Sequence, residues 1–409
     1  MAGIAQELRA DNEDLISLSV YIRSLTGLET TEAMIVDQRA KLISARAKTE
    51  TDLIFPKTDR DMAVEAVHTT IVSGDGKYVY IVGSKPHTEP TNQIKALDAP
   101  ATLIKVDAIT LQPILQQTMG GRLHHGMVFR DKYVLLDTFS RDPDGLDVML
   151  LDPNTDEIIG GVRDEDLGGS SYTAYTDDDY IYILMEPVGY ASHRSTGMLG
   201  AKNLYGGKIT TMKPFWIAKL DPETWEVVQE YPYPGFRGDW IAFDAEKEFM
   251  YVPAGGTSNV SKINMKTGEV VWAAGAGISP YGASLNAEET ELWVANKGEH
   301  TGHFGRTLSV LKAATGQQVA TVFSGYEVDH ILLAPNGKEM WATSNGEGRI
   351  YVYDTESHDE IAVIQMPQNG DPHGLVWVHY DENGESRVVR DQGVFRGGVN
   401  PALGKSLDY

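Results

Sequence analysis

The chain of 409 residues contains no cysteine. Without thiols it cannot form disulfides, attach haem c covalently, or hold an iron-sulfur cluster or a thiolate copper site. Basic charge is also scarce, because 35 lysines and arginines face 58 aspartates and glutamates, a formal net charge of -23. This negative balance argues against nucleic acid or an anionic membrane as the main partner.

Long apolar runs are missing as well. No stretch is long enough to span a bilayer, so we expect no membrane insertion. The first residues do not have the pattern of a signal peptide. The composition leaves two compartments open, the cytoplasm or an export compartment reached by a chain that is numbered after cleavage of a leader.

The chain does contain a repeated β-hairpin. In AVHTTIVSGDGKYVYIVG, from Ala66, a histidine precedes a short strand, a small-residue turn and a second strand. The same outline starts again at Leu123, Asp239, Tyr281, His330 and His373, with a weaker copy from Ser171. Each copy is followed by a second hairpin such as ATLIKVDAITLQPIL. Because the last four starts lie 42, 49 and 43 residues apart, the pattern predicts an all-β, seven-bladed β-propeller of YVTN-type repeats.

The N-terminal region differs from these repeats. Apolar residues from Leu15 to Leu25 follow a helical spacing, and a second helix is expected around residues 31–48. We therefore divide the chain into a helical extension, residues 1–50, and a propeller, residues 51–409. A segment near residues 52–57 is expected to complete the last blade. The first helix also resembles the last helix of a c-type cytochrome domain.

Residues that can bind a metal recur at the strand starts and in the loops that return to the same face. The candidate ligands are His68, His124, His125, Asp239, His303, His330 and His373. A single histidine beside a strand is most often structural, but a convergent set of imidazoles with one carboxylate and no thiolate suits copper, zinc or iron. The sequence leaves open which of His124 and His125 binds, and whether His300 replaces His303.

Two segments resemble a known superfamily. AVHTTIVSGDGKYVYIVG resembles the haem-bearing strand of cytochrome cd1 nitrite reductases, where the residue matching His68 is the proximal haem d1 ligand. DHILLAPNGKEMWATSNGEGRIYVYDTESHDEIAVI is similar to the late blades of these propellers. Nitrous oxide reductase and thiocyanate dehydrogenase are copper proteins of the same kind. The ligand order, with Asp239 among the histidines, resembles thiocyanate dehydrogenase, although Tyr281 stands where that family is expected to have a histidine.

The resemblance implies a periplasmic, copper-dependent oxidoreductase that oxidises thiocyanate to cyanate and sulfur. It implies a multinuclear site of three copper ions and an external electron acceptor such as a c-type cytochrome. Asp239 and Glu186 are the candidate proton acceptors, and Lys41 is a candidate for recruiting the anion. A homodimer is one option for the assembly. Two alternatives remain: a haem d1-binding propeller, either a nitrite reductase relative or a biosynthesis factor, and a non-catalytic propeller that binds a partner protein.

Overall fold

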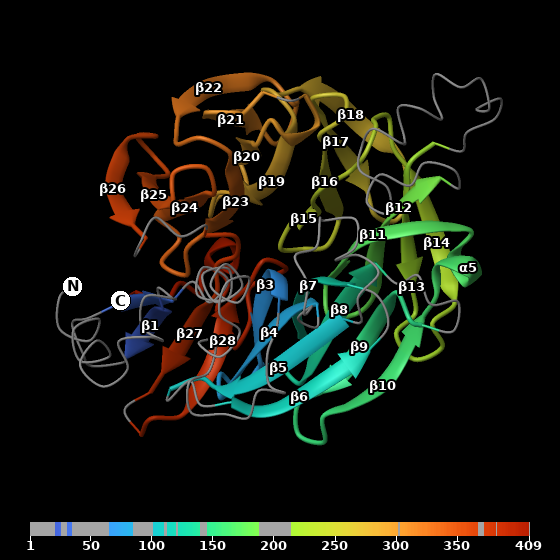
Figure 1. The fold of residues 1–409 in the computed structure, drawn as a ribbon. Coiled ribbons are helices and arrows are strands. Elements are labelled where there is room, and N and C mark those ends of the chain that lie inside the picture. The colour runs from blue at the N-terminus through green and yellow to red at the C-terminus, as the bar shows by residue number, and fades with distance from the viewer. Residues whose placement is uncertain are drawn as a thin grey trace.

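The protein is a β-propeller, in which sheets are arranged around a central axis (Figure 1). The computed structural model describes residues 21–25, 31–34, 65–84, 101–109, 113–119, 122–139, 145–187, 214–301, 303–366, 372–381 and 383–408. The all-β fold expected from the repeated hairpins is therefore confirmed.

Six blades each consist of four strands that are consecutive in the chain and pair antiparallel. The first three blades are β3 (Glu65–Val72), β4 (Tyr78–Ser84), β5 (Ala101–Asp107) and β6 (Pro113–Met119); β7 (Arg122–Phe129), β8 (Tyr133–Phe139), β9 (Val148–Asp152) and β10 (Glu157–Val162); and β11 (Gly169–Thr176), β12 (Ile181–Pro187), β13 (Trp216–Leu220) and β14 (Val227–Pro232). The next three are β15 (Ala242–Phe243), β16 (Phe249–Ala254), β17 (Asn259–Asn264) and β18 (Val270–Gly275); β19 (Pro280–Leu285), β20 (Glu291–Asn296), β21 (Thr307–Lys312) and β22 (Gln318–Phe323); and β23 (Val328–Leu333), β24 (Glu339–Ser344), β25 (Arg349–Asp354) and β26 (Glu360–Gln365).

The sequence predicts seven blades, but the structure shows six, and the remaining sheet is of another kind. In this sheet β1 (Tyr21–Leu25) and β2 (Thr31–Met34) join β27 (Trp377–Tyr380) and β28 (Ser386–Arg390), in the order β2-β1-β27-β28. The contact between the two ends of the chain is a parallel pair, β1 with β27, and not the antiparallel ladder of a blade. The sheet still connects the two ends of the chain beside β3 (Figure 1).

The N-terminal expectations are corrected where they fall on described residues. The segments Tyr21–Leu25 and Thr31–Met34 are strands, although their spacing predicts helices. Pairing with β27, more than 300 positions along the chain, outweighs the weak local helical preference. The rest of the expected extension and the segment 52–57 lie outside the described residues, and the boundary at residue 50 stays a prediction.

Burial follows the position of a strand in its blade. The inner strands β19 and β23 are buried along their whole length, because each blade packs against its neighbours on both faces. The outermost strand β18 alternates between half-buried and exposed residues, the period of a strand with one solvated face. Helix is nearly absent from the described residues, which contain α5 (Asp164–Leu167) and the 3-10 turns η2 (Glu299–Thr301) and η4 (Pro401–Leu403).

Short polar side chains fix the turns between the strands. In the turn after β19, Asn286 Oδ1 accepts hydrogen bonds from the backbone N–H groups of Thr290 and Glu291. Asp244 does the same after β15, where its Oδ1 accepts from Glu248 and Phe249. Such bonds join residues that are close in the sequence, so the local sequence fixes the register of these hairpins.

The C-terminal segment ties the last strands to the second and third blades. The carboxylate of Asp391 accepts from Val128 N–H at 2.9 Å, and the Gln392 amide donates to the Gly126 carbonyl at 3.0 Å. The buried Arg396 guanidinium contacts Asp178 at 2.7 Å and Asp391 at 3.2 Å. These contacts place Arg390 and the residues after it near the propeller axis, at the end where the inner hairpins turn.

Candidate metal centre

Three histidines from different sheets converge near the axis. They are His125 on β7, His330 on β23 and His373 just before β27, and one ring nitrogen of each lies within 4.8 Å of the other two. The closest pair is His125 Nε2 and His373 Nε2, 2.9 Å apart. All three are buried. Two ligand atoms on one ion with bonds of about 2 Å lie up to about 4 Å apart, so small ring rotations would complete a three-nitrogen site.

Irregular pairing at the starts of β7 and β23 turns His125 and His330 inward. The β7–β8 register shifts between Leu123 and Gly126, the interval that contains His125. The β23–β24 register shifts between Val328 and Ile331, around His330. A bulge of this kind bends the strand and re-aims the extra side chain. The repeated strand-start position of the sequence is therefore the position that faces the axis.

Polar contacts on the far side of the rings favour one tautomer for each of two histidines. His373 Nδ1 lies 2.7 Å from the carboxylate of Asp329, and this close contact favours the tautomer with the proton on Nδ1. Thr173 Oγ1 donates to Asp137, and therefore accepts from His125 Nδ1 at 3.2 Å. Both Nε2 atoms then present lone pairs to each other across 2.9 Å. This assignment follows from the hydrogen-bond network.

Two buried carboxylates support the histidines from behind. Asp137 accepts from the backbone N–H of His125 at 2.8 Å, and burial raises the pKa of Asp137 to about 7. Asp329 also contacts Lys297 Nζ at 3.2 Å. Burial lowers the pKa of His373 to about 3, which leaves its imidazole neutral, the form that binds metals. Carboxylates in such positions orient metal-binding histidines and raise their basicity.

His124 belongs to a second group that shares His125. Its Nδ1 lies 3.2 Å from Asp137 Oδ1, and its ring centroid is 3.8 Å from that of His125. His124, His125 and Asp137 together have the ligand spacing of a metal site. The structure therefore brings both members of the His-His pair to the centre, and His125 alone contributes to the three-histidine group.

A charged cluster lies beside the histidines. Asp239, fully buried, contacts Arg237 Nε at 3.2 Å and His300 Nε2 at 3.3 Å. Arg237 is buried too, and its guanidinium lies 4.5 Å above the Tyr172 ring. Its backbone has a φ of 62°, an uncommon conformation for a non-glycine residue that several turns of this chain share. Arg237 Nη2 has no hydrogen-bond partner among the described residues.

Tyr281 connects this cluster to the histidines. Its ring stacks on His330 at 5.9 Å between centroids, and its hydroxyl lies 2.9 Å from that of Tyr172. Lys297 Nζ lies 4.1 Å from the Tyr281 ring centroid. Burial keeps the pKa of Tyr281 well above its ordinary value, so Tyr281 is a neutral phenol. At the position where the resemblance leads us to expect a histidine ligand, Tyr281 instead packs its aromatic ring against His330.

The other expected site residues have different surroundings. Asp239 faces Arg237 and His300 and is not part of the two groups above, so its role as a ligand stays a prediction. His303 is exposed, whereas His300 reaches Asp239. Glu186 is buried, 3.9 Å from Arg237 Nε. His68 is on β3, but its side chain lies outside the described residues, as does Lys41.

The sequence interpretation misses the supporting residues, among them Asp137, Thr173, Lys297 and Asp329. Asp329 has a visible signal, because it directly precedes His330 in VDHILL. Asp137 and Thr173 give no such signal, since they come from strands whose neighbours are set only by the fold.

Comparison with known proteins adds no relative. No family model matches the chain, and no curated protein matches it significantly. Among the described residues, no helix is long and apolar enough to cross a membrane.

Proposed function

We propose that the protein is a metal-dependent oxidoreductase whose metal, copper, is held by His125, His330 and His373. The observation that carries this proposal is the 2.9 Å separation of His125 Nε2 and His373 Nε2, with a ring nitrogen of His330 within 4.8 Å of a ring nitrogen of each. With the proton of each ring on Nδ1, the two Nε2 lone pairs repel each other unless a cation lies beside both. Two bonds of about 2 Å at a right angle span about 2.8 Å, so the spacing suits two neighbouring ligands of one ion.

The donor set supports copper. Imidazole nitrogens without thiolate suit copper, zinc, iron and nickel, and copper(II) has the highest affinity among divalent first-row metals. Further ions would need His68, His124, Asp239 or His300. The cluster of three copper ions therefore belongs to the proposal and rests on the resemblance to thiocyanate dehydrogenase.

For the reaction we propose oxidation of a small anion, with thiocyanate as the first substrate to test. Thiocyanate and water would give cyanate, sulfur, two protons and two electrons. When bound, copper supplies a Lewis acid and a one-electron acceptor. Arg237 would hold the anion through Nη2, and Glu186, 3.9 Å from Arg237 Nε, would take a proton. The electrons would pass to an external carrier such as a c-type cytochrome, consistent with a periplasmic location.

The test combines metal content with activity. His330→Ala and His373→Ala should each lower the copper bound per chain after loading, measured by elemental analysis, and abolish thiocyanate oxidation. His358→Ala is the matched control, because this histidine contacts Glu291 at 2.9 Å, away from the three-histidine group. Unchanged copper content in both site variants would contradict the metal site. If the wild-type protein binds copper fully but does not oxidise thiocyanate, the proposed metal site stands and thiocyanate is ruled out as its substrate.

The two alternatives make different predictions in the same experiment. A haem d1 protein would give an intense Soret-type absorption and would depend on His68, whereas bound copper(II) gives weak visible bands and a paramagnetic resonance signal. A non-catalytic propeller would bind neither group. The first alternative has one specific support, since a buried arginine such as Arg237 could pair with a tetrapyrrole carboxylate.

A further inference from the structure

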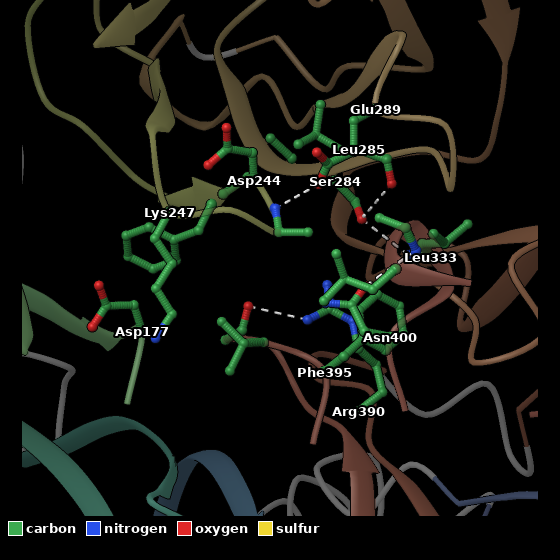
Figure 2. Close-up of a pocket in the computed structure, with 18 of the residues that line it drawn as sticks. Asp177, Asp244, Lys247, Ser284, Leu285, Glu289, Leu333, Arg390, Phe395 and Asn400 are labelled. Atoms are coloured by element: carbon green, nitrogen blue, oxygen red, sulfur yellow. Dashed lines mark hydrogen bonds between the residues drawn. The ribbon is translucent and has the colours of Figure 1, made fainter. Parts of the chain in front are cut away.

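The end of the axis where the inner hairpins turn contains a pocket that the proposed metal chemistry does not use. Its volume is about 300 Å³, the lower limit for a small-molecule site. The hairpin turns after β15 and β19 form one side, and the C-terminal segment forms the other (Figure 2). Trp240 contributes to the lining, and its ring also contacts His330 at 4.7 Å between centroids.

Arg390, on the C-terminal side of the pocket, is a buried cation that forms no ion pair with the described residues; its guanidinium lies 4.5 Å from the Phe395 ring centroid, and the neighbouring Asp391 acts on it only at longer range. Its exposed fraction is 6%, and its Nη1 donates to the Gly393 carbonyl at 3.0 Å. Its Nε has no hydrogen-bond partner, and no carboxylate of the described residues lies within ion-pair distance of the guanidinium. Burial lowers the pKa of Arg390 to about 10, so the side chain stays charged at neutral pH. A buried, unpaired guanidinium is costly, and an anionic ligand would compensate it.

Asp244 and Glu289, on the opposite side, are carboxylates that form no ion pair with the described residues. Each uses one oxygen for the backbone: Asp244 Oδ1 accepts from Phe249 N–H at 3.0 Å, and Glu289 Oε1 accepts from Ala245 N–H at 2.6 Å. Their second oxygens have no hydrogen-bond partner among the described residues. Burial, and then the charge of Asp244, raises the pKa of Glu289. Lys247 lies near but is engaged by Asp179 at 2.6 Å, and Lys262, whose charge acts to lower the pKa of both carboxyl groups, donates to the Ala313 carbonyl and forms no ion pair with either of them. A cation between the two carboxylates would relieve their desolvation and repulsion.

Figure 2 shows the open space between these two sides, with Asp244 and Glu289 across from Arg390. Apolar side chains, among them Leu285, Leu333 and Phe395, line the space between the charged groups. We propose that this pocket binds a small amino acid, with its carboxylate on Arg390, its ammonium group on Asp244 and Glu289, and its apolar carbon frame between them.

This arrangement disfavours ligands that carry only a carboxylate or only an ammonium group. A plain carboxylate leaves the acidic side unpaired, and a plain amine leaves Arg390 unpaired. A hydrogen bond to a charged group contributes roughly 1.5–3 kcal/mol, so each missing end should weaken binding about 10- to 100-fold. Selectivity for molecules with both charges is therefore the signature of the site.

The experiment is calorimetric titration of the full chain with two matched sets of ligands. One set is leucine, 4-methylpentanoate and 3-methylbutylamine, and the other is ε-aminocaproate, hexanoate and pentylamine. At least one of the two amino acids should bind about tenfold or more tightly than both its one-ended analogues. The proposal is overturned if neither amino acid binds, if a one-ended analogue binds equally well, or if a divalent cation such as Ca²⁺ competes for the same site more tightly.

Variants locate the binding. Arg390→Gln and Glu289→Gln should each weaken the amino acid about tenfold or more, while the exposed Arg349→Gln and Glu356→Gln should not change it. Because Arg390 is buried, its variant could lose stability, and Glu289→Gln then provides the test by itself. Glu289→Gln should also reduce the preference for the amino acid over its plain carboxylate. Unaltered affinity and preference in folded Glu289→Gln would contradict the assignment.

Discussion

Asp329 offers a direct test of how the candidate metal centre is supported. Its carboxylate lies 2.7 Å from His373 Nδ1, and it also contacts Lys297 Nζ at 3.2 Å and the Asn345 amide at 2.6 Å. Asp329→Asn keeps the shape and one oxygen acceptor but removes the negative charge. His373 then loses its contact with a negative charge, which makes its Nε2 a less basic ligand for a metal.

Two magnitudes follow from this geometry. Loss of such a supporting carboxylate typically lowers metal affinity 10- to 100-fold, so we expect copper affinity to fall within about that range. Removal of one partner from a buried ion pair can cost about 3–5 kcal/mol of stability. Here Lys297 keeps Glu299 at 3.0 Å, so a smaller loss, about 1–2 kcal/mol, is expected in the metal-free protein.

The assay is a competition titration of copper against a chelator of known affinity, beside urea unfolding of the metal-free protein. Asp408→Asn is the control, because it removes a carboxylate from an exposed pair with Lys338, where an ion pair contributes little. Wild-type copper affinity in a folded Asp329→Asn variant would refute the supporting role. Absence of copper binding in the wild type would refute the metal centre itself.

Three further predictions concern other parts of the molecule. Asp239→Asn should abolish thiocyanate oxidation at saturating copper. It should also lower the unfolding free energy by about 3 kcal/mol, because Arg237 stays buried without its nearest carboxylate. An active variant of normal stability would contradict both points. Glu289→Gln should raise the thermal midpoint at neutral pH, because folding raises the pKa of Glu289 and its ionised form therefore costs stability. This advantage should disappear below about pH 4, where the carboxyl group is protonated. Equal midpoints of variant and wild type at all pH values would contradict this reasoning. Removal of residues 1–34 should promote self-association, since it exposes the β27 edge that pairs with β1, and size-exclusion chromatography would show an unchanged monomer if this reasoning is wrong.

The repeated hairpins could be predicted because their signals are local. The turn after β3 closes through Ser73 and Asp75, and Gly76 has a φ of 71° that suits glycine. Such residues are visible in the sequence beside the strands that they connect. The strand β1 could not be predicted in this way, since Tyr21–Leu25 also fits a helical spacing and only its pairing with β27 makes it a strand.

In the candidate site, too, some residues could be predicted from local sequence signals and others depend on contacts that only the fold makes. His125, His330 and His373 were identified because each stands at the same position of a repeated unit, and the fold brings these three side chains together. The surroundings of Asp239 could not be read from the repeat, since Arg237 and His300 come from a strained turn and a separate loop. Position in a repeat therefore predicts the three histidines that meet, but it does not predict the surroundings of Asp239, because the partner of each charge depends on contacts between blades.

Buried arginines show how strictly this chain pairs its internal charges. The described residues bury Arg237, Arg390 and Arg396, and a guanidinium cannot give up its proton in a protein interior. Arg237 contacts Asp239, and Arg396 contacts Asp178 and Asp391. The chain has an excess of carboxylates from which a partner for Arg390 could come, yet the described residues provide none within ion-pair distance. Lys262 is also buried without an ion pair, but its Nζ donates to the Ala313 carbonyl at 3.2 Å, whereas Arg390 Nε has no partner among the described residues and its side chain lines a cavity, which favours a ligand there.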